Sequence, residues 1–270
     1  MPKLMQNEAT QAQQTTSGFS FTGTPIDKLG ASEYTIVTIL LDLSGSVAGW
    51  ERKLEECVKV IVSACRKSPR SDNLVIRLVA FNTATWEIHG FVELKNINLN
   101  DYDNKFDAEG GTALLDALLN GVESTGDYAE ELAAKRMICN AVLFAITDGD
   151  ENSSTIATIN CRNPADAQKK IAKALETVRG KEVLESIKTI LIGIADPKTS
   201  EGQHLERLLT AIKTNGNIDE MVMIGDMSKG TLAKLAGFVS KSVSSSSQAL
   251  NTGGPSQPVN PSTVTPLDQI

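Results

Sequence analysis

The sequence predicts an α/β fold: a doubly wound, mostly parallel sheet with helices on both faces and one antiparallel edge strand. The first observation is that its apolar runs, such as residues 35–41 and 141–146, are continuous rather than alternating. Continuous runs are typical of strands buried on both faces. The second is that such runs alternate with amphipathic helical stretches, as in βαβ units. The third is that polar residues follow directly where several of these runs end.

The composition is that of an ordinary globular protein, with 41% hydrophobic and 22% charged residues among 270. No apolar run approaches the ~20 residues of a membrane span, and residues 1–8 lead into a polar stretch rather than a signal peptide. We therefore expect a cytoplasmic protein that contacts no membrane. The net charge of −7 comes from residues 31–240, which argues against a nucleic-acid partner.

The four cysteines predict neither a zinc site nor disulfides. They contain no CxxC pair, and we expect them to be small buried hydrophobes in a reducing compartment. They are Cys57, Cys65, Cys139 and Cys161.

The first half of the chain predicts a flexible arm followed by three strands. The arm covers residues 1–32, with an edge strand or clasp near Phe19–Phe21. A strand over residues 35–41 precedes a helix over 50–66, and a second strand covers 74–81. The three-residue gap at 82–84 has hairpin length, so residues 85–91 should return antiparallel. A long polar loop then occupies residues 96–111.

The second half predicts alternating helices and strands. Helices are expected over 113–122, 128–139, 164–178, 204–213 and 228–240, and strands over 141–146, 187–195 and 220–224. One domain would span residues 33–242. Residues 243–270, rich in Ser, Asn, Gln and Pro, are expected to form a disordered tail.

Three polar segments should meet at one edge of this sheet. Asp42, Ser44 and Ser46 follow the first strand, Thr112 lies behind two glycines, and Asp148 follows the strand 141–146. Ligands of open α/β sheets bind at the carboxyl ends of the strands. Three hydroxyls and two carboxylates suit a hard divalent cation that keeps some water. Each segment alone also fits an ordinary turn or helix cap.

These segments resemble the three motifs of the von Willebrand factor type A (VWA) domain, which has a Rossmann-like fold. The matching stretches are residues 42–49, 110–112 and 146–149, in the family's order, and the resemblance covers about residues 33–242. It implies a metal ion-dependent adhesion site (MIDAS) that binds Mg²⁺, with Mn²⁺ or Ca²⁺ as alternatives. Ser44, Ser46 and Thr112 would coordinate directly, whereas Asp42 and Asp148 would act through bound water. A partner protein's Asp or Glu would take the remaining position.

Two further patterns lead to weaker expectations. Residues 238–247 resemble the end of bacterial VWA proteins associated with tellurium resistance and stress response. Residues 148–152 resemble the start of a calcium loop, but Ser153 replaces its glycine and Ile159 its final glutamate, which argues against an EF-hand. The acidic residues of the 96–111 loop fit a solvated loop better than a second cation site.

The sequence therefore predicts a non-catalytic module that binds a partner carboxylate through Mg²⁺. The alternatives are a metal-dependent phosphoester hydrolase, or a structural subunit of a larger assembly or phage particle. An enzyme is not expected, because Ser44 stands where a phosphoaspartyl phosphatase has its second aspartate. The chain also lacks a GxxxxGK[ST] phosphate loop.

Overall fold

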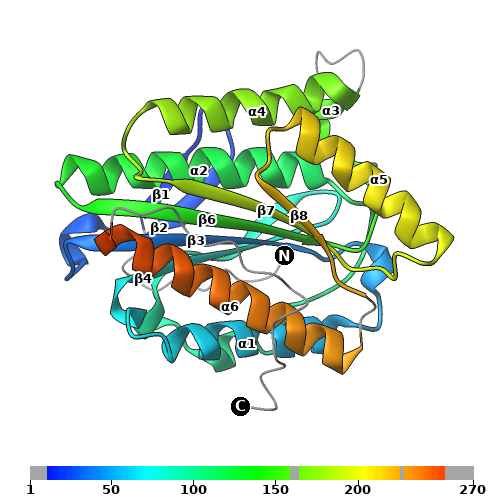
Figure 1. Cartoon of the computed structure of the whole chain (residues 1–270), viewed down its shortest axis with the longest axis horizontal. Helices are drawn as coiled ribbons and strands as arrows, with labels where there is room; N and C mark the ends of the chain where they lie inside the picture. The colour runs from blue at the N-terminus through cyan, green and yellow to red at the C-terminus, as the bar shows by residue number, and fades with distance from the viewer. Residues whose placement is uncertain (1–10, 159–163, 226–227, 253–270) are drawn as a thin grey trace.

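A computed structural model describes residues 11–158, 164–225 and 228–252. Its centre is an eight-stranded sheet with the strand order β1-β2-β5-β4-β3-β6-β7-β8 (Figure 1). The strands are β1 (Gln11–Gln14), β2 (Ser20–Gly23), β3 (Glu33–Asp42), β4 (Leu74–Phe81), β5 (Thr85–Glu93), β6 (Ile138–Thr147), β7 (Ile187–Gly193) and β8 (Glu220–Met223). The pairs β1–β2 and β4–β5 are antiparallel, and all others are parallel.

Helices cover both faces of the sheet, as expected. The helices are α1 (Glu51–Arg66), α2 (Leu114–Ala134), α3 (Thr155–Thr158), α4 (Pro164–Gly180), α5 (Ser200–Asn215) and α6 (Lys229–Thr252). In Figure 1, α1 and α6 lie below the sheet, and α2 and α4 lie above it. Side chains of β3 alternate between the two cores: Val37 and Ile39 join the core of α1 and α6, whereas Ile36 and Leu40 join that of α2, α4 and α5.

The register of the central strands brings their carboxyl ends together. Asp42, the last residue of β3, pairs with Phe81 at the end of β4, and Leu41 pairs with Ile146 near the end of β6. The residues that follow β3, β4 and β6 therefore start from one edge of the sheet. This edge is where the sequence predicts the binding site.

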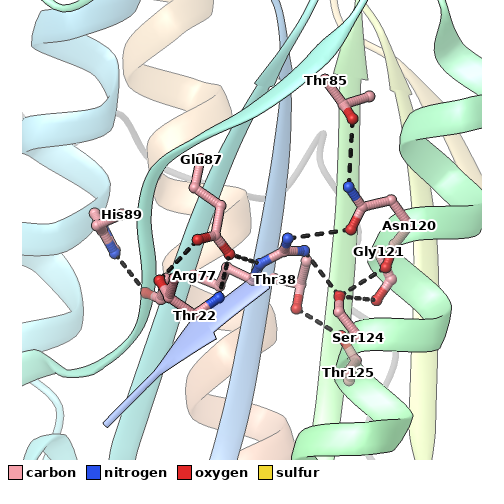
Figure 2. A network of polar contacts seen from close by, with 11 residues as sticks. Thr22, Thr38, Arg77, Thr85, Glu87, His89, Asn120, Gly121, Ser124 and Thr125 are labelled. Atoms are coloured by element: carbon pink, nitrogen blue, oxygen red, sulfur yellow. Dashed lines mark hydrogen bonds and ion pairs between the residues drawn. The ribbon is translucent and has the colours of Figure 1, made fainter. Parts of the chain in front are cut away.

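The antiparallel strand was predicted correctly, but its position at the edge was wrong. β2 pairs with the outer side of β5, and β1 forms the edge instead. Residues 11–32 thus belong to the folded domain rather than to a free arm, and β2 supplies the strand expected near Phe19–Phe21. The physical reason is burial: Phe21 is buried and packs edge-on against Phe91, with ring centroids 6.0 Å apart. Glu87 of β5 also accepts hydrogen bonds from Thr22 N–H and Oγ1–H (Figure 2).

The C-terminal helix is longer than predicted. The expected helix over 228–240 continues to Thr252, so residues 243–252 are helical rather than part of a tail. Val243 is buried in the core shared with α1, and two backbone carbonyls of this segment accept hydrogen bonds from Asn140 and Arg70. Serine composition alone did not reveal these contacts. The two helices expected over 113–139 are the single helix α2, after which β6 begins at Ile138.

Cys57, Cys65 and Cys139 are buried free thiols, as expected, and burial raises the pKa of each to about 12. Cys161 lies outside the described residues. Among the helices that the structure describes, none is both long and apolar enough to cross a membrane.

Candidate functional site

Asp42, the last residue of β3, is held by the loop that follows it and by the end of β6. It is buried, and its Oδ1 accepts a hydrogen bond from Ser44 N–H at 2.8 Å. Its Oδ2 accepts one from the Thr147 hydroxyl at 2.5 Å. Burial raises the pKa of Asp42 to about 6, against the opposing effect of these hydrogen bonds, and the nearby Asp148 carboxylate adds to the rise. A cation beside this carboxylate would relieve the cost of burying its charge.

A chain of short contacts joins the first and third predicted segments. The hydroxyls of Ser44 and Ser46 lie 3.0 Å apart, and the Ser46 hydroxyl donates to Asp148 Oδ1 at 2.8 Å. Ser44 is buried and Ser46 is exposed. Desolvation raises the pKa of Asp148 as well, against the lowering effect of the Ser46 hydrogen bond. Residues separated by about a hundred positions in the chain thus meet in one site.

Thr112 joins the same cluster, as the position of Gly149 demonstrates. A Cβ atom built on Gly149 would lie 3.2 Å from Ser46 Oγ, 3.3 Å from Thr112 Oγ1 and 3.7 Å from Ser44 Oγ. The three hydroxyls therefore surround one point. A side chain at position 149 would intrude among them, which gives a physical reason for glycine after Asp148.

Backbone hydrogen bonds fix the loops relative to one another. Gly45 N–H donates to Gly110 O at 3.0 Å, and Glu109 N–H donates to Leu43 O at 3.0 Å. These two bonds fasten the loop after β3 to the loop before α2. Ala113 N–H donates to Asn82 O at 2.6 Å, which adds the loop after β4. Backbone hydrogen bonds therefore join the three loops around the hydroxyl cluster.

The donor set fits a hard cation held mainly by hydroxyl oxygens. In the part of the chain that the structure describes, no three His, Cys, Asp or Glu side chains form a group that could hold a metal ion. The predicted set contains only two such residues, Asp42 and Asp148. Oxygen donors without nitrogen or sulfur suit Mg²⁺, Mn²⁺ or Ca²⁺ rather than zinc or copper. Metal binding by these five residues stays a prediction.

Several residues outside the predicted set have structural partners. Asp103 forms an ion pair with Lys59, in line with a solvated loop. Trp50 packs against the core of α1 and α6, with the Lys53 ammonium 3.8 Å from its ring centroid. His204, which stands alone in the sequence, pairs with Asp150 at 2.8 Å on the loop that carries Asp148. The spacing of the chain gave no sign of this pair.

Sequence reasoning missed the residues that support the site. Thr147 was part of the matched stretch 146–149, but its bond to Asp42 depends on the register of β3 and β6. Asn152 and Glu151, which appeared only in the rejected calcium-loop pattern, hold the start of α2. A run of short polar residues after a buried strand was the only available signal.

Comparisons with known proteins support the fold. No protein-family model matches the chain. No curated protein matches it either. The PilB minor pilin from Streptococcus sanguinis superposes with a TM-score of 0.55 at 17% identity, over 88% of this chain and 67% of that chain. The pilus adhesin SpaC from Lactobacillus rhamnosus GG gives a TM-score of 0.53 at 12% identity, over 88% of this chain and 34% of the adhesin.

A third structure is the mussel byssus protein PTMP1 with a zinc-occupied MIDAS motif, at 15% identity over 77% of this chain and 45% of that chain. The TM-score of this superposition is 0.47. The similarity to PilB and SpaC extends to the general α/β fold, and identities this low establish nothing about ligands. The chain is thus an α/β protein with a polar cluster at the carboxyl edge of its sheet.

Proposed function

We propose that this protein is a VWA-type interaction module that binds an acidic side chain of a partner protein through a divalent cation, Mg²⁺ first among the candidates. Ser44, Ser46 and Thr112 would hold the cation, and Asp42 and Asp148 would act through bound water. When bound, the cation supplies a positive charge to which a partner's Asp or Glu can attach. The observation that carries the proposal is the meeting of three hydroxyls around the Cβ position of Gly149.

The protein's own residues would prepare the site for the cation. Thr147 and the Ser44 backbone fix both oxygens of the Asp42 carboxylate, so this group needs no rearrangement on binding. Both carboxylates of the site have raised pKa values because they are desolvated. Partial desolvation also strengthens the attraction between a cation and a partner's carboxylate.

The partner should carry basic residues around its acidic ligand. The loop that carries Asp148 also contains the exposed Asp150, and the chain has a net charge of −7. Such a rim repels an isolated carboxylate at a distance. Electrostatic complementarity therefore favours a partner in which Lys or Arg surrounds the Asp or Glu.

Metal binding by Gly149→Ala tests the proposal. The added methyl would enter the space among the three hydroxyls, and we expect the affinity for Mn²⁺ or Mg²⁺, measured by calorimetry, to fall at least about tenfold, ~1.4 kcal/mol. Gly30→Ala is the matched control, because a Cβ at Gly30 meets nothing within 4 Å. Equal affinities of the two variants would contradict the proposed site.

Capture of the partner tests the second half of the proposal. We expect wild-type protein in Mg²⁺ to retain a partner that is lost with chelator and with Asp42→Ala. Partner binding that survives both treatments would contradict a metal-mediated contact. The place of the protein in a bacterial tellurium-resistance or stress system stays a prediction, because it rests only on the serine-rich stretch 238–247.

A metal-dependent phosphoester hydrolase is the second candidate. The observation that favours it is the pair His204–Asp150, since a histidine oriented by a carboxylate is a common general base. Both side chains are more than half exposed, which is unlike a desolvated catalytic pair. Hydrolysis of p-nitrophenyl phosphate that disappears in both His204→Gln and Asp148→Ala would establish catalysis in place of binding alone.

A further inference from the structure

The loop after β6 holds Thr112 by its backbone from both directions. Thr112 N–H donates to Asn152 Oδ1 at 2.9 Å, while Asn152 N–H and Ser153 N–H donate to Thr112 O at 3.0 and 3.1 Å. This contact needs glycine at position 111, because a Cβ there would lie 2.5 Å from Asn152 Oδ1 and 2.2 Å from Ser153 Oγ. Thr112 therefore cannot shift without moving the loop that carries Asp148.

Glu151 makes the corresponding contact with the first turn of α2. Its Oε2 accepts hydrogen bonds from Leu115 N–H at 2.8 Å and from the Ser154 hydroxyl at 2.6 Å. Its Oε1 accepts from Ser153 N–H at 3.2 Å and Ser154 N–H at 2.8 Å. The N–H of Leu115 is one of the first-turn donors that a helix leaves unpaired, and a negative charge is favourable there.

Asp116 of α2 in turn binds the residues that follow Glu151, at the start of α3. Its side chain is buried and accepts hydrogen bonds from Thr155 N–H, the Thr155 hydroxyl and Ile156 N–H at 2.8, 2.9 and 2.9 Å. Its own N–H donates to Ser154 Oγ at 3.1 Å. Each segment thus caps the other: Glu151 caps the start of α2, and Asp116 caps the start of α3.

Glu151 is occupied by this role and is not free to bind a metal ion. A carboxylate has about four lone-pair positions, and Glu151 receives four hydrogen bonds from three residues. The neighbouring Asp150, in contrast, is exposed and contacts only His204 among the bonds described. Two adjacent carboxylates in the rejected calcium-loop pattern therefore differ in what they do.

We propose that Glu151 is a positioning residue that locks the Thr112 loop to the Asp148 loop and thereby sets the metal affinity of the site without touching the ion. The inference rests on the proposed function, since it assigns Thr112 and Asp148 to one cation. The two loops are about 40 residues apart in the chain, with Leu115 and Glu151 separated by 36. Fixing them to each other before the cation arrives reduces the cost of assembling the site.

The test is Mn²⁺ binding by Glu151→Gln. The amide keeps the size of the side chain, but its NH₂ group would face N–H donors in place of an accepting oxygen. We expect Mn²⁺ affinity, measured by calorimetry and by electron paramagnetic resonance, to fall about 10-fold to 100-fold. Hydrogen exchange of the Thr112 and Leu115 amides should accelerate in the metal-free protein. Glu176→Gln makes the same substitution at an exposed position of α4 and should change neither quantity by more than about twofold.

A double-mutant cycle separates positioning from a general loss of stability. If Glu151 acts through Thr112, then Glu151→Gln should have no further effect on Mn²⁺ affinity once Thr112→Ala is present. Additive losses would overturn the inference. Should Glu151→Gln fail to fold, Asn152→Ala offers a milder opening of the same lock, since it removes the acceptor of Thr112 N–H.

The outcomes distinguish the inference from the function on which it rests. A wild-type protein that binds no Mn²⁺ overturns the proposed function and the inference together. If the wild type binds Mn²⁺ and Glu151→Gln binds it equally tightly, the inference is overturned and the proposed function stands. Faster amide exchange with reduced Mn²⁺ affinity in Glu151→Gln, and neither change in Glu176→Gln, would support both.

Discussion

His89 is a buried histidine whose protonation state can be assigned from its neighbours. Its Nδ1 lies 2.8 Å from Gly90 O, and its Nε2 lies 2.9 Å from the Tyr102 hydroxyl. A carbonyl oxygen only accepts hydrogen bonds, so Nδ1 carries a proton, and in the neutral ring Nε2 accepts from Tyr102. Burial of the ring favours its neutral form in the folded protein.

Acid should destabilise the protein through His89. Burial lowers its pKa below the ordinary value of 6.5, and Arg77 acts in the same direction, against Gly90 O, Glu87 and Asp101. Above pH 6.5 both the folded and unfolded states are neutral at this position. Below it, only the unfolded state takes up the proton. The free energy of unfolding therefore decreases as the pH is lowered, until the folded-state pKa is reached.

The stability difference between wild type and His89→Gln isolates this effect. Urea unfolding from pH 7.5 to 5 should show the wild type losing up to about 1.4 kcal/mol per pH unit relative to the variant below pH 6.5. The comparison cancels the contributions of the carboxylates, which are common to both proteins. A constant difference across this range would contradict the assignment.

At the level of residues, the sequence identified the residues of the candidate site but not the residues that hold them in place by hydrogen bonds. Asp42, Ser44, Ser46, Thr112 and Asp148 follow predicted strands or precede a helix, so the topology alone brought them to one edge. Thr147, Glu151 and Asn152 act through hydrogen bonds between segments far apart in the chain. No local pattern specifies such partners, because each depends on the register of elements that must first be packed.

At the level of secondary-structure elements, a buried polar network joins the strands β2, β4 and β5 to α2. Arg77 of β4 is fully buried and donates from Nε to Glu87 of β5 at 2.6 Å (Figure 2). Its other nitrogens donate to Ser124 and Asn120 of α2. Glu87 also accepts the bonds from Thr22 that fasten β2. One ion pair therefore anchors the hairpin of β1 and β2 to the core.

Removing the charge of Glu87 should destabilise the fold strongly. Glu87→Gln leaves the buried Arg77 guanidinium without a counterion, and we expect a loss of about 3–5 kcal/mol in urea unfolding. Lys169→Met, which removes an exposed pair with Asp166 at 3.7 Å, is the control and should cost less than about 1 kcal/mol. A similar small loss in Glu87→Gln would contradict the anchoring role of the pair.

The same network explains why the N-terminal elements were mispredicted. Residues 11–23 lack a strong apolar pattern, and composition indicated an arm. The strands form because β5 offers an outer edge, a carboxylate for Thr22 and an aromatic ring for Phe21. The central strands β3, β4 and β6 were predictable, since strands buried on both faces have continuous apolar runs in the sequence.

At the scale of the whole molecule, the first and last segments that the structure describes complete the sheet and its helical cover. β1 and β2 extend the sheet beyond β5, and α6 runs along α1 on the face opposite α2 (Figure 1). Both segments were predicted to be at least partly flexible from their polar composition. Hydrogen bonds with Glu87, Asn140 and Arg70 instead hold β2 and α6 in place.

The last turns of α6 should therefore contribute measurably to global stability. We compare a chain that ends at residue 252 with one that ends at residue 242. The shorter chain loses Val243, which is buried in the core with α1, and the carbonyls that accept hydrogen bonds from Asn140 and Arg70. Burial of a valine contributes about 1.5–3 kcal/mol and each hydrogen bond about 0.5–1.5 kcal/mol.

We expect removal of residues 243–252 to lower the free energy of unfolding by at least the contribution of the buried Val243, about 1.5–3 kcal/mol. Urea unfolding followed by circular dichroism measures it, and Val243→Ala in the 252-residue chain should reproduce a part. Equal stability of the two chains would mean that the serine-rich turns rest on the sheet without stabilising it. A loss in both comparisons would make α6, up to its last described turn, a structural part of the domain that supports the site at the opposite end of β3 and β6.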